Sequence, residues 1–194
     1  MGKPATVKVR PLTAKNWPDL EKLFGPRGAC AGCWCMTYRL SHSTWKKQQG
    51  EKNRRAFQRI VASGVPTGVL AYLGKEPVGW CAVAPREDFP ALDRSRVLAR
   101  VDDAPVWSIV CFFVARGMRH RGMTSDLIEA AVRYARRNGA RIVEAYPVEP
   151  GAGGTADAFA FTGLASAFRR AGFVEAARRS PRRAVYRLDL TRGR

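Results

Sequence analysis

An apolar run that passes through a basic, glycine-containing loop into an amphipathic pattern is the feature that most constrains the fold of this chain. The apolar run covers residues 106–114, and the loop covers residues 115–124. Beyond the loop, apolar residues recur at the three- and four-residue spacing of one helix face: Leu127, Ile128, Ala131, Val132 and Ala135. This order predicts a strand, a tight loop and the start of a helix.

The loop between this strand and this helix has the composition of an anion site. Arg119 and Arg121 can form charge-assisted hydrogen bonds, and Gly122 leaves room for a ligand beside the backbone. Backbone N–H groups at a helix start converge on one point, where the helix dipole is positive, so such a loop suits a bound phosphate. The patterns G-x-x-x-x-G-K-[ST] and G-x-G-x-x-G do not occur at this turn, which argues against two common nucleotide sites.

The spacing resembles motif A of the GNAT acetyltransferase superfamily, in which R/Q-x-x-G-x-G/A begins five residues after a strand valine. Val114, Arg119 and Gly122 fall in that register, and Thr124 stands where Gly or Ala is usual. In that family the motif holds the pyrophosphate of acetyl-CoA, so the resemblance implies acetyl-CoA as co-substrate. The competing interpretation is an ordinary strand–loop–helix connection with surface arginines. The cofactor-binding residues that the resemblance implies are Phe112, Phe113, Val114, Arg119, His120, Arg121, Gly122, Met123 and Thr124.

The predicted elements occur in an order that also resembles the GNAT fold. Strands are predicted over 6–10, 67–73, 77–84, 141–147, 173–177 and 183–190. Helices are predicted over 13–24 and 45–62, and a third has Phe161, Leu164, Ala165 and Phe168 on one face. A glycine-rich loop over 149–155 leaves the fourth of these strands. The resemblance implies one α/β (α+β) domain, with a mixed central sheet flanked by helices and parallel strands that splay apart at the cofactor cleft.

The length of the chain suits a single domain, taken here as residues 1–194, because 194 residues with 46% hydrophobic content can bury a substantial core. No apolar run approaches the ~20 residues that cross a bilayer, and the N-terminus lacks the apolar core of a secretory signal. We therefore expect a cytoplasmic protein, a monomer or a homodimer, without a membrane partner.

The net charge of +18 comes from 34 basic residues against 16 acidic ones, spread along the chain. Such a surface attracts polyanions without specificity, and CoA is itself a polyanion. A solvated basic surface is one interpretation of this charge. The alternative function is a protein that binds nucleic acid, or one that acetylates an amine carried by a nucleic acid.

The predicted reaction needs groups that move protons, since an amine must lose a proton before or as it attacks the thioester. By the resemblance, Ser108 stands where a glutamate base is frequent, and Phe168 stands where a tyrosine acid is frequent. On the next predicted strand, Glu144 and Tyr146 share one face. We predict Glu144 as the base, directly or through water, and Tyr146 as the acid or a substrate contact. The alternative is that Glu144 pairs with an arginine and Tyr146 packs in the core.

The segment Cys30-x-x-Cys33-Trp34-Cys35 admits three interpretations: a zinc site completed by His42, a redox pair, or a packed wall of the substrate site. No second C-x-x-C pair is present, so we predict no bound metal. The resemblance places this segment on the acceptor side, with Trp34, Cys35 and Tyr38 as substrate-binding residues. The predicted function is acetyl transfer from acetyl-CoA to a primary amine of a small molecule or a protein.

Overall fold

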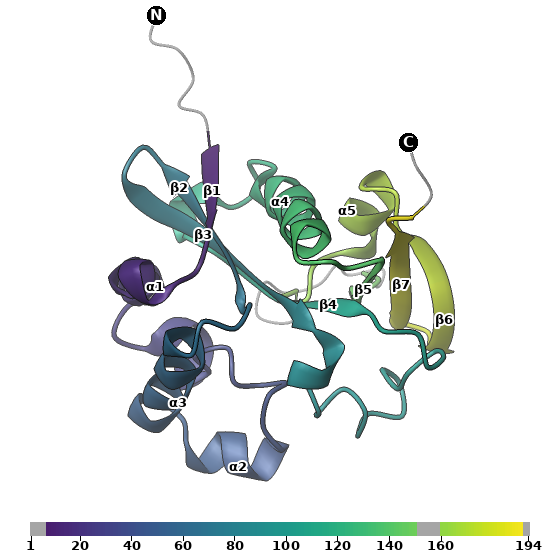
Figure 1. Cartoon of the computed structure of the whole chain (residues 1–194), viewed down its shortest axis with the longest axis horizontal. Coiled ribbons are helices and arrows are strands. Elements are labelled where there is room, and N and C mark those ends of the chain that lie inside the picture. Colours follow the sequence, from purple (N-terminus) through teal and green to yellow (C-terminus); the bar gives the residue numbers. More distant parts are fainter. Residues whose placement is uncertain (1–6, 151–159, 192–194) are drawn as a thin grey trace, which may run out of the picture.

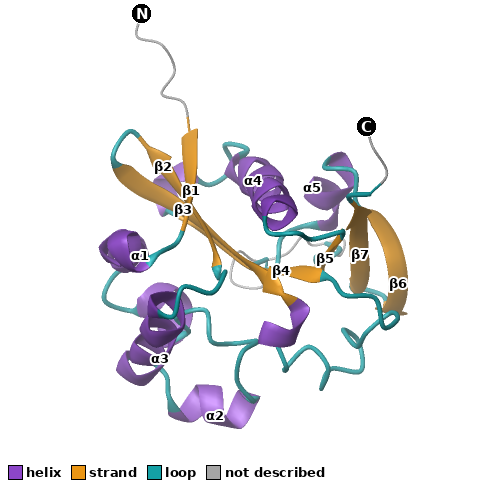
Figure 2. Cartoon of the chain, viewed as in Figure 1, coloured by secondary structure: helices purple, strands orange, loops and turns teal. Residues whose placement is uncertain are grey.

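Alternating apolar residues build a mixed sheet that carries helices on both faces (Figure 1). The computed structural model describes residues 7–150 and 160–191. In this part of the chain the strands are β1 (Val7–Pro11), β2 (Gly68–Leu73), β3 (Glu76–Pro85), β4 (Trp107–Val114), β5 (Ile142–Ala145), β6 (Val174–Ser180) and β7 (Arg183–Asp189). Figure 2 shows them as one twisted layer between helices.

The seven strands of the described residues follow the order β1-β2-β3-β4-β5-β7-β6. Neighbours pair antiparallel, except that β4 and β5 pair parallel. The parallel pairing is short, because it joins Trp107–Ile109 only to residues 143–145. β4 then continues to Val114 while β5 ends at Ala145, so the two strands part halfway along β4. This confirms the predicted mixed sheet with splayed parallel strands.

The helices divide into two groups on opposite faces of the sheet: α1 (Trp17–Phe24), α2 (His42–Lys47) and α3 (Glu51–Ala62) on one side, and α4 (Met123–Arg137) and α5 (Ala165–Arg170) on the other (Figure 1). Successive side chains of β2 point to opposite faces of the sheet and therefore contact both groups of helices. Val69 and Ala71 belong to the core under α4 and α5, whereas Leu70 and Tyr72 belong to the core under α1 and α3. The sheet thus has an apolar layer on each face.

One predicted helix, over residues 45–62, proves to be two helices, α2 and α3. Gly50 precedes α3 with a φ of 81°, a left-handed backbone value that breaks a helix and favours glycine. α2 begins earlier than predicted, because the Ser41 side chain accepts a hydrogen bond from the N–H of Thr44 at 3.2 Å and caps it. The apolar spacing alone did not reveal this break.

A second correction concerns the last predicted helix. Phe161 and Leu164 do not lie on it, because α5 begins only at Ala165 and the backbone of Leu164 is extended. The predicted glycine-rich loop lies outside the described residues from position 151 to 155. The remaining strands and helices match the predicted order, with boundaries that move by a few residues.

Candidate active site

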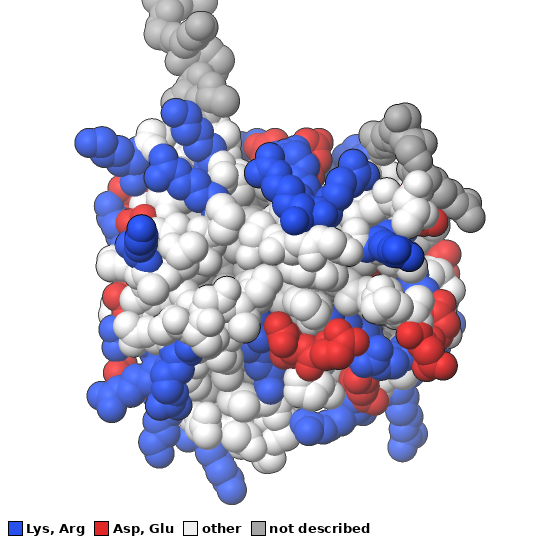
Figure 3. Space-filling view, viewed as in Figure 1, with Lys and Arg blue, Asp and Glu red and all other residues white. Residues whose placement is uncertain are grey.

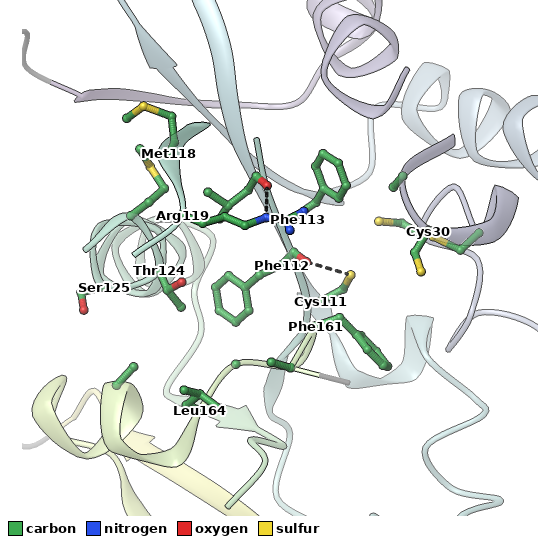
Figure 4. A pocket seen from close by; sticks show the side chains of 18 of the residues that line it. Cys30, Cys111, Phe112, Phe113, Met118, Arg119, Thr124, Ser125, Phe161 and Leu164 are labelled. Atoms are coloured by element: carbon green, nitrogen blue, oxygen red, sulfur yellow. Dashed lines mark hydrogen bonds between the residues drawn. The ribbon is translucent and has the colours of Figure 1, made fainter. Parts of the chain in front are cut away.

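A cavity of about 780 Å³ lies beside the half of β4 that β5 does not cover. One end of this cavity is formed by the start of α4 together with α5, and the other by the loop of residues 29–37 with α2. Cys111, Phe112, Phe113 and Val114 of β4 lie between the two ends (Figure 4). We call this cavity the cleft. Its end at α4 and α5 is the helix end, and its end at residues 29–37 and α2 is the loop end.

The helix end contains the loop that the sequence singled out. After Val114, the chain makes a short 3-10 turn, and Arg119 extends before α4 starts at Met123. His120 (φ 59°) and Gly122 (φ 80°) are both left-handed, which turns the backbone sharply at the helix start. Eight of the nine predicted cofactor-binding residues line the cleft, whereas Arg121 does not. Their assignment to the cofactor stays a prediction.

The edge of β4 is less open than the sequence predicted. The N–H of Phe112 donates to the carbonyl of Phe161 at 2.6 Å, so it is already occupied. The N–H of Ala115 points the other way, to the carbonyl of Val78 at 2.9 Å. Because N–H directions alternate along a strand, the N–H of Val114 is turned toward the cleft. Val114 also accepts a hydrogen bond from Nε of Arg119 at 3.3 Å through its carbonyl.

Several lining residues were not found from the sequence. Phe24, Thr37, Met118, Ser125, Phe161, Leu164, Ser166 and Arg170 all face the cavity. Arg170 is the last residue of α5 and lines the helix end of the cavity. The start of α4 carries a recognisable sequence motif, but the other lining residues do not belong to a motif. Their position in the cavity could therefore not be predicted from the sequence.

Four thiols line the cleft: Cys30, Cys33, Cys35 and Cys111. Burial raises the pKa of Cys33 to about 11. A hydrogen bond with the Cys35 thiol, together with burial, raises the pKa of Cys111 well above its usual range. Since the charged form of a buried thiol is disfavoured, Cys33 and Cys111 are neutral at physiological pH.

The loop that carries three of these thiols has an unusual backbone. Ala29, Ala31, Trp34 and Cys35 are left-handed, with φ between 41° and 65°. Such values are strained for side chains with a Cβ and persist only where the surroundings impose them. The constraint here is contact: Nε1 of Trp80 donates to Sγ of Cys35 at 2.8 Å. This contact holds Cys35 against Trp80 of β3.

The predicted substrate-binding residues separate into those that line the cleft and those that support it. Cys35 lines the cavity. Trp34 is buried instead, with its ring 5.5 Å from that of Phe24 and 6.0 Å from that of Trp17. Tyr38 does not line the cavity, and its ring lies 6.4 Å from that of the lining residue Phe161. We therefore assign Trp34 to packing rather than to substrate contact.

Glu144 and Tyr146 do meet, but away from the cleft. The Tyr146 hydroxyl donates to Glu144 at 2.6 Å and contacts Ser108 at 2.8 Å. Arg86 lies 2.6 Å from both groups, and Arg187 lies 2.8 Å from the second carboxylate oxygen of Glu144. Glu144 and Tyr146 are fully buried, and neither lines the cavity. This placement fits the structural alternative, because a base must reach its substrate. The roles of Glu144 as base and Tyr146 as acid stay predictions.

The acidic loops next to β4 are likewise engaged elsewhere. Asp102 accepts hydrogen bonds from Arg187 at 2.6 and 3.0 Å, and Asp93 pairs with Arg86 at 2.8 Å. Asp88 lies 3.7 Å from Arg39. None of these carboxylates lines the cleft among residues 7–150 and 160–191.

Metal ligands do not gather anywhere in the part of the chain that the structure describes: there is no group of three or more His, Cys, Asp or Glu arranged to hold an ion. His42, which the zinc interpretation required, packs with its ring 5.8 Å from that of Trp45. Within the same residues, no helix combines the length and apolar character needed to cross a bilayer.

The fold and the cleft together have the character of an acyltransferase. Residues 34–156, more than half of the chain, match the sequence profile of the acetyltransferase (GNAT) family. The chain belongs to this family. It is an acetyl-CoA-dependent N-acetyltransferase, with acetyl-CoA as its co-substrate.

Solved structures of other family members share the fold. An N-acetyltransferase from Staphylococcus aureus is 14% identical, with a TM-score of 0.54 over 95% of this chain and 99% of that one. The Drosophila melanogaster polyamine N-acetyltransferase is 12% identical, with a TM-score of 0.53 over 95% and 100%. The Thermoplasma acidophilum PaiA N-acetyltransferase, solved with coenzyme A, is 12% identical, with a TM-score of 0.52 over 95% and 99%. No curated protein matches the chain in sequence.

The basic surface gives no support to the nucleic-acid alternative. Figure 3 shows Lys and Arg side chains in several separate places on one face, with uncharged surface between them and an acidic group among them. The comparisons point to acetyltransferases and contain nothing that favours nucleic-acid binding. The charge of +18 is thus a property of this surface rather than an indication of its substrate.

Proposed function

We propose that this enzyme acetylates the amine of a small molecule that enters the cleft at its loop end, while acetyl-CoA occupies the helix end. The observation that carries this proposal is one cavity that reaches from the start of α4, past the uncovered edge of β4, to the thiol-lined loop. The Drosophila relative acts on polyamines and another relative acts on agmatine, which supports an amine as acceptor.

The helix end suits the pyrophosphate of acetyl-CoA. The N–H groups of Met123 and Thr124 lie in the first turn of α4, where a helix offers them no acceptor of its own. A 15-residue helix also directs the positive end of its dipole to this point. Arg119 and Arg170 bring positive charge from two sides. Gly122 lets the ligand approach the backbone, since a Cβ there would meet nothing within 4 Å but a longer side chain would enter the cleft.

The chemistry follows from the same arrangement. The acceptor nitrogen attacks the acetyl carbonyl carbon, the bond between that carbon and the CoA sulfur breaks, and the CoA thiolate leaves and takes up a proton from solvent. The Val114 N–H, turned toward the cleft, stabilises the negative charge that develops on the carbonyl oxygen. No described carboxylate lines the cleft, so the proton that the nitrogen loses passes to water. The five free thiols suit a reducing compartment such as the cytoplasm.

The test is a pair of glycine substitutions. Gly122 lies directly before α4, and Gly139 lies just after its end. Both glycines have a positive φ, of 80° and 86°. At both positions an added Cβ would meet no atom within 4 Å. Gly122→Glu and Gly139→Glu therefore introduce the same backbone strain and the same charge. Only Gly122 lines the cleft. We expect Gly122→Glu to abolish acetyl-CoA binding in calorimetry, and Gly139→Glu to bind as the wild type does.

Two results would count against the proposal. Equal acetyl-CoA affinity in the two folded variants would remove the cofactor from this loop. Equal loss in both would trace the effect to helix strain rather than to the cleft. Thermal unfolding of both variants, recorded alongside, shows whether the strain is matched.

A further inference from the structure

The loop end of the cleft is a surface without charge. It consists of Phe24, Ala29, Cys30, Ala31, Cys33, Cys35, Thr37 and Trp45, faced by Cys111 and Phe161. We call these residues the acceptor wall. Figure 4 shows Cys30 on this side of the cavity, across from Cys111 and Phe161, with Thr124 at the far end and Arg119 beside Phe113 between them.

Charged side chains that line the cavity lie at the helix end only, within the described part of the chain. They are Arg119 and Arg170, with His120 beside them. No described Asp or Glu contributes to the lining. The charges that the described residues bring to the cavity are therefore positive and would repel an ammonium group.

Neither Cys33 nor Cys111 supplies a negative charge to the acceptor wall. Burial holds the Cys33 thiol in its neutral form, with a pKa of about 11, and the Cys111 thiol is neutral for the same reason together with its hydrogen bond to Cys35. A thiol of this kind behaves as a small, polarisable apolar group. Glu144, the carboxylate that the sequence predicted as the base, is hydrogen-bonded to Arg86 and Arg187.

These facts limit which amines can react. An alkyl amine with a pKa of about 10.4 is neutral in only about one molecule in 10³ at pH 7, so it needs a carboxylate to bind its ammonium form or a base to deprotonate it. An aromatic amine is weakly basic, because its nitrogen lone pair is delocalised into the ring. It is therefore already neutral at pH 7 and needs neither group.

We propose that the acceptor is a weakly basic aromatic amine whose ring packs against the acceptor wall; this rests on the function proposed above. The rings of Phe24, Phe113, Trp45 and Phe161 line the cavity and offer it aromatic faces and edges. The neutral nitrogen attacks the acetyl carbonyl, the carbon–sulfur bond breaks, the nitrogen gives its proton to water, and the CoA thiolate takes one up. A weakly basic aromatic amine thus accounts both for the uncharged acceptor wall and for the lack of a lining carboxylate among residues 7–150 and 160–191.

The experiment compares aniline with benzylamine, which carry the same ring on amines of different basicity, and adds agmatine as a cationic acceptor. Purified full-length enzyme and acetyl-CoA are assayed by thiol release from pH 6 to 9. We expect kcat/KM at pH 7 to be highest for aniline and almost independent of pH. For benzylamine it should rise about tenfold per pH unit, because only its neutral form reacts.

A charge placed on the acceptor wall gives the second arm. Cys30 is exposed and lines the cleft, so Cys30→Asp adds a carboxylate without burying it, and Cys30→Asn is the neutral control of the same shape. We expect Cys30→Asp to raise the ratio of benzylamine to aniline turnover by about tenfold, because the added carboxylate can accept the proton that benzylammonium must lose before its nitrogen attacks. Cys30→Asn should leave the ratio unchanged.

The outcomes separate this inference from the function on which it rests. Wild-type preference for agmatine or benzylamine over aniline at pH 7 overturns it, as does acetyl-CoA binding without acetylation of aniline. An equal shift of the ratio in Cys30→Asp and Cys30→Asn also contradicts it. Failure to bind acetyl-CoA at all would instead refute the proposed function.

Discussion

The two halves of β4 have opposite electrostatic character. Where β4 pairs with β5, Arg86, Glu144, Tyr146 and Arg187 form a buried polar network in which every charge has a partner. Where β4 runs on alone, its neighbours are thiols, aromatic rings and the glycine loop. The strand is continuous, but its surroundings change completely after Ile109.

This contrast shows where the carboxylate nearest to Ser108, that of Glu144, lies in this enzyme. Ser108 occupies the position where related acetyltransferases often have a glutamate, and the parallel register places it directly beside Glu144. The carboxylate thus lies one strand over from the expected position, where two arginines neutralise it. Both oxygens of this carboxylate are already engaged by arginines, and the side chain does not line the cleft where a substrate would sit.

The largest effect should come from breaking the network. Glu144→Gln removes the charge that Arg86 and Arg187 share, and both guanidinium groups are largely shielded from water, with side chains 1% and 13% exposed. Arg86 keeps Asp93 and Arg187 keeps Asp102, so each guanidinium retains one acidic partner. Breaking a buried ion pair commonly costs about 3–5 kcal/mol, and the remaining partners place the expected loss in the free energy of unfolding at the lower end, about 3 kcal/mol. Urea denaturation measures this loss, and acetyl-CoA affinity should stay unchanged in the folded protein.

A catalytic role for Glu144 would give a different result: full stability with turnover lost. Tyr146→Phe serves as the milder companion, because it removes one hydroxyl from the same network and leaves the charges paired. Its loss of stability should be smaller, about 1–3 kcal/mol for a buried polar group left unpaired. Normal kinetics in this variant would agree with a packing role.

An intermediate effect should appear in the reactivity of the cleft thiols. The pKa of Cys33 is raised to about 11, so at pH 8 its thiolate fraction is about a hundredfold smaller than that of a thiol with a pKa of 9. We expect iodoacetamide to label the exposed Cys30 first, and the rate at Cys33 to keep rising up to pH 10. Tandem mass spectrometry of the shared peptide distinguishes the two sites. A rate at Cys33 that levels off near pH 8 would contradict a neutral acceptor wall.

The smallest effect should come from the exposed margin of the network. Hydrogen bonds from Arg187, and then from the N–H of Ala104, lower the pKa of Asp102. Because the folded pKa is lowered, this contribution is fully present above the unfolded value of about 3.9 and is lost as the pH falls through the folded value. Half-exposed pairs of this kind contribute below about 1 kcal/mol.

We therefore expect Asp102→Asn to lower the free energy of unfolding slightly at pH 7, by an amount that shrinks toward pH 3. Asp103→Asn is the control, since Asp103 is exposed beside it and has no arginine contact in the described part of the chain. A difference between the two variants that does not change with pH would show that the arginine contact is not its cause.

The sequence by itself determined the order of elements and the position of the glycine-containing loop before α4. Both depend on local patterns: the two-residue period of strands, the three- and four-residue period of α4, and the run of Arg119 to Thr124 at its start. Such patterns extend over one helix turn or one strand, so they can be recognised without knowing how the rest of the molecule folds. The break at Gly50 was missed because residues 46–55 contain no apolar side chain, so no periodicity was present there to be interrupted.

Only the tertiary structure decided what Glu144 and the cysteines do. Glu144 meets Arg86 and Arg187 from 58 and 43 positions away, and no local pattern records such a meeting. The same holds for Cys111, which joins the thiols of the 29–37 loop across the cleft, and for Phe161, whose carbonyl covers β4. The chemistry of a carboxylate or a thiol depends on its burial and its partners, and folding fixes both through contacts between distant segments.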